Sequence, residues 1–291
     1  MLPISLIVST ASIGIVYAVL ALAVVFIYRT SRVLLFCVGE IGMLSAYVLR
    51  DVWVWVGPGL GGFAAGAAAA IAAAAVVGLI LYTVIERFGG HHNHFVGTIV
   101  TVAFSIFLLG VLSAGWGGEI SRLPIRLGFT TVLGQRVPLL GPAVIAVGVV
   151  VLATVGLALS WSDFGIDSQA LADNRRLAQL RGIPVERRLQ AIWISAAVMS
   201  GIGGCLSAAV SSVSIEGAVV GLSGIVAAII GGLTSPLGAI IGAILLALGE
   251  NVTTSLFDAR YSHVVPVLFL VALLIVRPSG LSGRAESIAR V

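Results

Sequence analysis

Residues 163–204 read DFGIDSQALADNRRLAQLRGIPVERRLQAIWISAAVMSGIGG, and they lead from the only long polar segment of the chain into an apolar run. Apolar residues recur at helical spacing in the polar half, which predicts a short amphipathic helix over residues 169–180. Gly182 is placed to end this helix, and Pro184 to open the next. The apolar stripe consists of Ala170, Leu171, Leu177, Ala178 and Leu180.

A short amphipathic helix between two membrane spans needs something to cover its apolar face. The natural candidate is a soluble protein partner. We therefore interpret residues 161–188 as a loop outside the bilayer that docks on a partner, and we call it the docking segment. Its polar half carries Arg175, Arg176, Arg181, Arg187 and Arg188, interspersed with Asp163, Asp167, Asp173 and Glu186.

The composition of the chain indicates a membrane protein. Hydrophobic residues make up 59% of the sequence and charged residues 10%, whereas soluble domains carry about 25% charged residues. A length of 291 residues allows about eight spans of roughly 20 residues each. The predicted fold is all-α, a polytopic transmembrane bundle of about eight or nine segments, some short or discontinuous, forming one domain over residues 1–291.

The apolar runs give the expected segments. Trp53 and Trp55 suit a membrane boundary, so residues 52–62 are predicted to be an interfacial turn that Gly57-Pro58-Gly59 breaks. Alternation within residues 116–138 would allow a small hairpin. The runs at 219–232 and 236–249 are short for full spans, with a break at 231–238. The predicted segments are residues 5–28, 33–49, 63–85, 95–114, 139–160, 189–211, 219–232, 236–249 and 263–276.

The basic residues predict the orientation. All 16 are arginines, and if the docking segment is cytoplasmic and the segments alternate, eleven fall inside. This places the N-terminus outside and the C-terminus inside. The arginines expected outside are Arg50, Arg122, Arg126, Arg136 and Arg260, and those expected inside with the docking segment are Arg29, Arg32, Arg87, Arg277, Arg284 and Arg290.

The sequence offers little for catalysis. His91, His92 and His94 form a cluster, but they lie in a Gly-flanked loop without a second group of ligands, which is typical of a solvated loop. The sequence has no Walker A, HExxH or GxSxG motif. Cys37 and Cys205 lie in apolar runs and are expected to be free thiols. We expect no bound metal or nucleotide and no role in binding nucleic acid.

Two carboxylates lie within apolar runs, and both are candidates for a transport path. A charge in the centre of a membrane helix costs on the order of 2.5–3.5 kcal/mol, so Glu40 and Glu250 should face a polar cavity or a partner. The alternatives are a helix cap formed by Gly39-Glu40 and an interfacial role for Glu250. Short helices interrupted by Gly and Pro also occur in transport paths. The path candidates are Gly39, Glu40, Gly231, Gly232, Ser235 and Glu250.

Five motifs in this order resemble the permease subunits of branched-chain amino acid ABC importers, the LivH-type family. They cover nearly the whole chain, and their order and spacing make the combined signal specific. The first two are GIVYAVLALAVVFIY at 14–28 and VGEIGMLSAY at 38–47. The third is the docking segment with the helix that follows it. The last two are GGLTSPLGAIIGAILLALGE at 231–250 and RPSGLSG at 277–283.

The resemblance implies a set of partners and a location. A permease of this family would lie in the bacterial inner membrane as a multi-pass protein and would rest on two cytoplasmic ATP-binding subunits, which hold ATP and Mg. It would pair with a second homologous permease or a copy of itself, and an external binding protein would deliver the substrate. The resemblance places ATPase coupling at Leu171, Ala172, Asp173, Arg175, Arg176, Leu177, Ala178, Leu180 and Gly182.

The substrate stays open at this point. The family often has polar residues before its Gly-Glu pair, where this chain has Leu35 and Val38. Related permeases carry urea, short amides or sugars as well as amino acids. A secondary carrier driven by an ion gradient would also place a carboxylate such as Glu40 in the membrane. A passive channel is less consistent with the sequence, because it would have no need of a charged docking helix.

Overall fold

The computed structural model describes residues 4–57, 59–88, 94–125, 128–132, 135–256, 264–277 and 280–282. These residues form eleven α-helices, one 3₁₀ helix and one two-stranded hairpin, which confirms the predicted all-α membrane bundle. Several residues used in the sequence analysis lie outside the described residues. They are Pro58, His91, His92, Arg126, Arg260, Pro278, Ser279, Gly283, Arg284 and Arg290.

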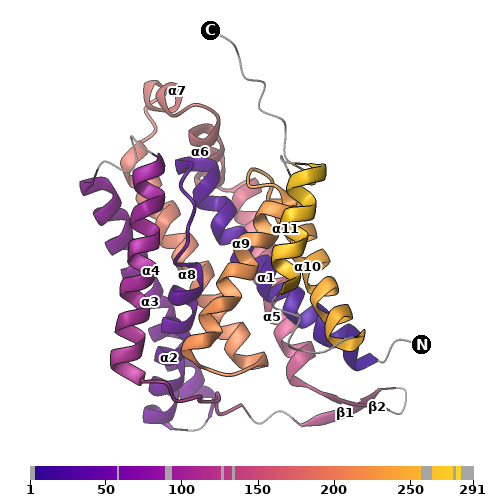
Figure 1. Cartoon of the computed structure of the whole chain (residues 1–291). Helices are drawn as coiled ribbons and strands as arrows, with labels where there is room; N and C mark the ends of the chain where they lie inside the picture. The colour runs from indigo at the N-terminus through magenta and orange to yellow at the C-terminus, as the bar shows by residue number, and fades with distance from the viewer. Residues whose placement is uncertain are drawn as a thin grey trace.

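Among the described residues, six helices are long and apolar enough to cross a membrane (Figure 1). They are α1 (Ile4–Ser31), α3 (Leu60–Arg87), α4 (His94–Trp116), α5 (Leu140–Trp161), α8 (Val185–Val210) and α10 (Pro236–Leu256). Shorter helices complete the bundle. They are α2 (Val38–Val56), the 3₁₀ helix η1 (Ile215–Ala218), α9 (Val219–Gly231) and α11 (Val265–Val276).

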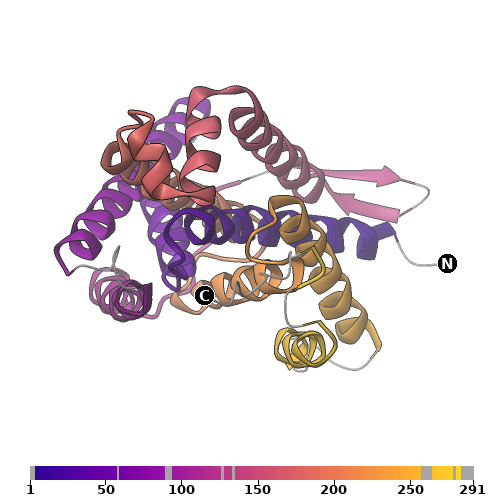
Figure 2. The same ribbon diagram turned by 90° about the horizontal axis from the view of Figure 1, so that it is seen from above.

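The helix α1 forms the centre of the bundle. Seen from above, it crosses the middle of the molecule, and it packs against α5, α8, α9 and α10 (Figure 2). Its residues from Val16 to Ile27 are all buried. The helices α4 and α5 lie at the periphery, with most of their apolar side chains exposed. Exposed apolar side chains on the outer helices fit a protein surrounded by lipid.

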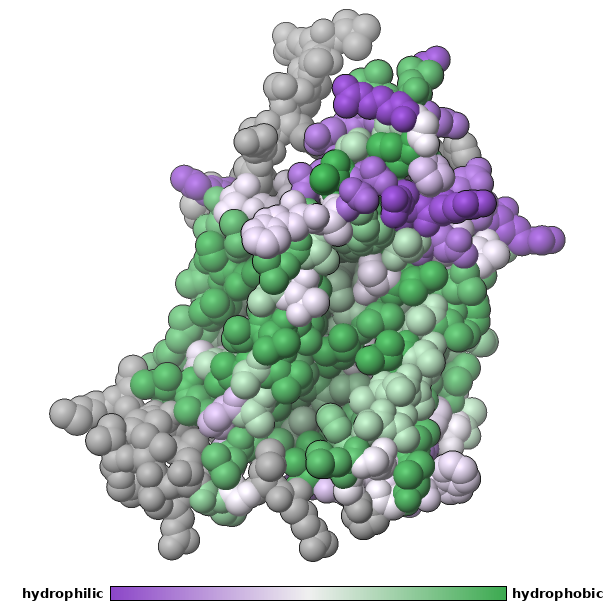
Figure 3. Space-filling view, turned by 180° about the vertical axis from the view of Figure 1, so that it is seen from behind, coloured by the Kyte–Doolittle hydropathy of each residue, from purple (hydrophilic) through white to green (hydrophobic). Residues whose placement is uncertain are grey.

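The two ends of the bundle differ. The helices α6 (Asp163–Asp173) and α7 (Arg175–Leu180) of the docking segment lie at one end, and the hairpin of β1 (Phe129–Val132) and β2 (Gln135–Pro138) lies at the other (Figure 1). The hairpin confirms the expectation for residues 116–138, with Phe129 opposite Pro138. Hydrophilic side chains gather over the docking segment, above a belt of apolar surface (Figure 3).

Three predicted boundaries were wrong. The second segment, predicted over residues 33–49, is helical only from Val38 onward. The helix α2 continues through the expected turn as far as Val56, because its polar residues have partners. Asp51 accepts a hydrogen bond from the Trp116 indole at 2.5 Å and pairs with Arg50 at 3.2 Å, while Trp53 packs edge-on against Phe63.

The helix α10 also runs further than predicted, to Leu256, and its 21 residues suffice to cross the bilayer. Its polar residues do not end it, because Asn251 donates a hydrogen bond to the Ala247 carbonyl one turn earlier.

The segment between α1 and α2 is not helical, and α4 supplies hydrogen bonds to its backbone. The Thr101 hydroxyl donates to the Leu34 carbonyl at 2.7 Å and accepts from the Phe36 amide at 3.4 Å. Thr98 accepts from the Leu34 amide at 3.4 Å, and the His94 ring contacts the Ser31 carbonyl at 2.8 Å. Such bonds matter because irregular backbone within a membrane needs partners inside the protein.

A Thr101→Val variant should therefore be less stable than the parent by about 1–2 kcal/mol, because two backbone groups lose their partner without a change in side-chain shape. The unfolding free energy in mixed micelles measures the effect. Thr154→Val is the matched control, since Thr154 is exposed and bonds only to the Val150 carbonyl of its own helix. Equal stability of the two variants would contradict a supporting role for α4.

Glycines allow three helices to meet backbone to backbone in the middle of the bundle. A Cβ placed on Gly204 of α8 would lie 2.2 Å from the backbone of Gly42 in α2. One placed on Gly221 of α9 would lie 2.4 Å from the backbone of Gly39 in α2. The starts of α2 and α9 are thus fixed against each other and against α8, and they position the carboxylate of Glu40.

Candidate functional site

The docking segment consists of two short helices rather than the single helix predicted over residues 169–180. The first begins earlier, at Asp163, where the Ser162 hydroxyl accepts a hydrogen bond from the Gly165 amide. The chain then breaks at Asn174, whose side chain accepts from the Leu177 amide at 3.0 Å and so caps α7. Asparagine is among the strongest N-cap residues, and this local bond outweighs the continuous apolar stripe.

The predicted end of the helix is confirmed. Gly182 adopts a φ of +83°, a conformation that glycine reaches without strain. Its amide donates to the Gln179 carbonyl at 3.0 Å, and the Ile183 amide donates to the Ala178 carbonyl at 3.2 Å. This arrangement closes α7 and turns the chain toward α8.

The predicted coupling residues divide into two groups. Leu171 and Ala178 are each 3% exposed and face the rest of the protein. Leu177 is 58% exposed and Leu180 78% exposed, so these two present an apolar surface away from the bundle. Among the other members, Asp173 and Arg176 are exposed, while Ala172 and Arg175 are half-buried. The exposed leucines beside arginines are the part of the segment that a partner could cover.

The helix α6 of the docking segment is attached to the membrane helices α1 and α8 by apolar and polar contacts. Arg188, at the start of α8, forms an ion pair with Asp167 of α6 at 2.7 Å. The Phe164 ring of α6 packs against Phe26 near the end of α1, with ring centroids 6.0 Å apart. The segment is therefore joined directly to two of the central helices, α1 and α8.

A polar cavity of about 430 Å³ lies at the other end of the bundle, between α1, η1, α9 and α10. The Glu250 side chain is 8% exposed and lines it. Glu250 accepts a hydrogen bond from the Tyr17 hydroxyl at 2.6 Å and a weaker one from Ser223 at 3.5 Å. Ser9 donates to Asn251 at 3.4 Å on the same wall. We call this space the Glu250 cavity.

The other predicted carboxylate, Glu40, lines a separate cavity of about 300 Å³. It is 9% exposed and accepts a hydrogen bond from Ser105 of α4 at 2.7 Å. It also lies in the first turn of α2, so it occupies both the helix start and the cavity wall that the sequence offered as alternatives. Val219 lines both cavities, which places the start of α9 between them.

Gly39 lies in α2 beside Glu40, and the other three path candidates, Gly231, Gly232 and Ser235, form a turn. Gly232 has a φ of +105° and ends α9, and the Ser235 hydroxyl accepts from the Gly238 amide at 3.1 Å where α10 begins. Gly231 packs against the backbone of Gly238. None of these glycines, nor Ser235, is among the residues that line the two carboxylate cavities. Their role in the described structure is to bring α9 and α10 together.

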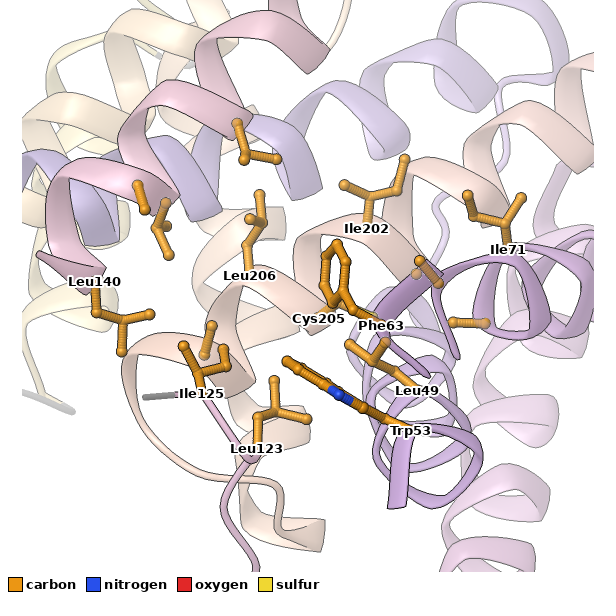
Figure 4. Close-up of a pocket in the computed structure, with 17 residues that line it drawn as sticks. Leu49, Trp53, Phe63, Ile71, Leu123, Ile125, Leu140, Ile202, Cys205 and Leu206 are labelled. Atoms are coloured by element: carbon orange, nitrogen blue, oxygen red, sulfur yellow. The ribbon is translucent and has the colours of Figure 1, made fainter. Parts of the chain in front are cut away.

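A third cavity, of about 320 Å³, is almost wholly apolar (Figure 4). Side chains of α2, α3, α5, α8 and the chain after α4 surround it, among them Leu49, Trp53, Phe63, Leu123 and Leu206. Such a lining suits apolar groups and offers no carboxylate or hydroxyl to a polar solute. Among the described residues no group of three or more His, Cys, Asp or Glu side chains could hold a metal ion, and His91 and His92 lie outside them.

Sequence reasoning missed the hydroxyl partners of the carboxylates, which are Tyr17, Ser223 and Ser105. Each is a single polar residue in an apolar run, and no local pattern distinguishes it from a polar side chain bonded within its own helix.

Together, a multi-pass helical bundle, buried carboxylates beside cavities and a polar segment at one end define a membrane transport subunit. Comparison with known proteins specifies which kind.

Residues 6–274 match the family described as the branched-chain amino acid transport system permease component, and the chain belongs to this family. It is 25% identical over 288 residues to the high-affinity branched-chain amino acid transport system permease protein LivH of Escherichia coli K12. It is 24% identical over 295 residues to the corresponding protein of Salmonella typhimurium and to BraD of Pseudomonas aeruginosa. Each comparison covers 94% of both chains. No solved structure matches the chain.

Membership of this family confirms the resemblance given by the five motifs. The protein is a permease of the inner membrane with several spans, and it is a transport subunit rather than a catalytic enzyme. As a permease component, it acts within a transport system that has other subunits.

Proposed function

We propose that this chain forms the membrane pathway of an ATP-driven importer that carries branched-chain amino acids. The observation that carries the proposal is the docking segment, in which Leu177 and Leu180 present an exposed apolar surface among arginines at one end of an apolar bundle. The named relatives, which are branched-chain amino acid permeases over 94% of this chain, support the substrate class.

The proposed assembly assigns a partner to each end of the bundle. Two ATP-binding subunits cover the docking segment on the cytoplasmic side and hold ATP and Mg. An external binding protein delivers substrate at the hairpin end, and a second permease, homologous or identical, completes the pathway. The arginine count supports this orientation, with the N-terminus outside and the C-terminus inside.

The proposed roles of the residues follow from their positions. The exposed members of the coupling set contact the ATP-binding subunits, and the buried Leu171 and Ala178 hold α6 and α7 on the bundle. Glu40 and Glu250 belong to the pathway, because each lines a cavity. Gly39 fixes the start of α2 beside Glu40. Gly231, Gly232 and Ser235 support the pathway by forming the α9–α10 turn.

Co-purification of the tagged protein with the products of neighbouring genes tests the proposal. We expect a P-loop ATPase to co-purify, and its activity to rise severalfold with the external binding protein and leucine. ATP-driven leucine uptake into proteoliposomes should require all of these components. If the chain purifies alone and transports solute in response to an ion gradient, the result would instead support a secondary carrier that uses a carboxylate for coupling. ATP-driven uptake of urea, short amides or sugars in place of leucine would support an ATP-driven importer but contradict branched-chain amino acids as its substrate.

A further inference from the structure

The Glu250 cavity combines the buried carboxylate of Glu250 with aliphatic side chains and further polar groups, among them the exposed carboxylate of Glu216. Glu250 sits on α10, while Ile13 of α1 and Val219 and Val220 of α9 supply apolar side chains around the same space. A volume of about 430 Å³ lies within the range of roughly 300–1,000 Å³ that is usual for small-molecule sites. The cavity therefore has room for a solute with an aliphatic side chain and a polar head.

The carboxyl group of Glu250 lacks a cationic partner among the described residues. Its hydrogen-bond donors there are the neutral hydroxyls of Tyr17 and Ser223, and the ion pairs found in the described residues involve other carboxylates. A buried carboxylate is normally paired with a cation, because hydroxyls alone offset only part of its lost hydration. The cavity beside Glu250 is thus suited to a solute that brings a positive charge of its own.

We propose that Glu250 binds the α-ammonium group of the amino acid in transit, and that Ile13, Val219 and Val220 contact its aliphatic side chain. This inference rests on the proposed function for the identity of the amino acid. It adds that the permease itself recognises the ammonium group, in addition to any selection by the external binding protein. Solutes without a cationic group would gain at most a hydrogen bond from a neutral donor, which is weaker than a bond from an ammonium group.

A purely structural role for Glu250 predicts different behaviour. The contacts to Tyr17 and Ser223 join α10 to α1 and α9, so Glu250 could simply hold three helices together. A Glu250→Gln variant separates the two roles. The amide keeps an oxygen that accepts from Tyr17 or Ser223 and preserves the side-chain shape, but it removes the charge that an ammonium group would pair with.

The experiment uses the complete permease–ATPase complex in nanodiscs without the external binding protein. Binding of radiolabelled leucine is measured, with competition by leucinol, which keeps the ammonium, and by 4-methylpentanoate, which lacks it. In the parent protein we expect leucinol to compete and 4-methylpentanoate to compete at least tenfold more weakly. Glu250→Gln should weaken leucine binding tenfold or more. Glu119→Gln, an exposed carboxylate outside the cavity, is the matched control and should bind as the parent does.

Two results would overturn the inference. One is equal competition by leucinol and 4-methylpentanoate in the parent protein, and the other is unchanged leucine binding by Glu250→Gln. If Glu250→Gln fails to assemble, the competition by leucinol and 4-methylpentanoate is compared in the parent protein and in Tyr17→Phe, which keeps the Glu250 carboxylate. Stronger competition by leucinol in both proteins would support the inference, and equal competition would overturn it. Failure of the proposed function looks different. The parent complex with all its partners would then import no branched-chain amino acid, while direct binding of leucinol would still test recognition of the ammonium.

Discussion

A Gly204→Ala variant is expected to lose the folded bundle, with little protein recovered in monodisperse form. The added Cβ would lie 2.2 Å from the backbone of Gly42, a distance that real Cβ atoms do not reach. Backbone cannot turn aside as a flexible side chain can, so α8 and α2 would have to separate. Overpacking in a tight core costs about 1–3 kcal/mol and more where the backbone must shift. Yield and thermal stability by fluorescence-detected size exclusion measure the effect.

Gly110→Ala is the matched control for this prediction. Gly110 also lies in a membrane helix, α4, but no atom lies within 4 Å of a Cβ placed there. We expect this variant to be as stable as the parent or slightly more so, since alanine favours a helix by up to about 1 kcal/mol. Equal recovery of both variants would show that the close approach of α8 and α2 is not required for folding.

A Leu177→Glu variant should lose ATP-driven uptake by at least tenfold while the bundle stays folded. Leu177 is 58% exposed, so a charge there is tolerated in the isolated subunit. In the proposed complex the same side chain would be buried against an ATP-binding subunit, where an unpaired carboxylate is costly. A few residues in well-packed, desolvated positions carry most of the binding energy of a typical interface. Co-purification of the ATPase and uptake in proteoliposomes measure the two effects separately.

The matched control is Ile120→Glu, which makes the same change at the opposite end of the bundle. Ile120 is 72% exposed and lies in the chain that follows α4. This variant should retain the ATP-binding subunits and their activity in the absence of the external binding protein. Full uptake and normal ATPase recovery with Leu177→Glu would exclude the exposed face of α7 as the docking surface.

The sequence predicted those parts of the fold that depend on local patterns. Composition and apolar runs gave the membrane bundle, and Gly182 was assigned its turn correctly because its role depends on its own backbone conformation. Boundaries failed where distant contacts override local signals. Asp51 suggests the end of a helix in the sequence, but the Trp116 indole 65 residues away stabilises it inside α2. Asn174 had the opposite effect, since its capping bond broke a helix that hydrophobic periodicity alone predicted.

The site was predictable to a similar extent. Glu40 and Glu250 were identifiable because a carboxylate in an apolar run is costly wherever it lies. Their surroundings were not, because Tyr17 lies 233 residues from Glu250 in the sequence and has no charge or motif to connect it. The docking segment was recognisable as a whole. The division between its buried and exposed leucines depends on how α6 and α7 fold back on the bundle, and a helical stripe does not contain that information.

The attachment of the docking segment to α8 has a mechanical consequence. The helix α8 is continuous over 26 residues, from the ion pair of Arg188 with Asp167 to beyond Gly204. Those two positions are separated by 16 residues, or about 24 Å at 1.5 Å per residue. At Gly204 no side chain stands between α8 and α2 to absorb a displacement. The helix can therefore act as a stiff rod, so that a displacement at the end that carries Arg188 moves the backbone beside Glu40 and is not absorbed by rotamer changes.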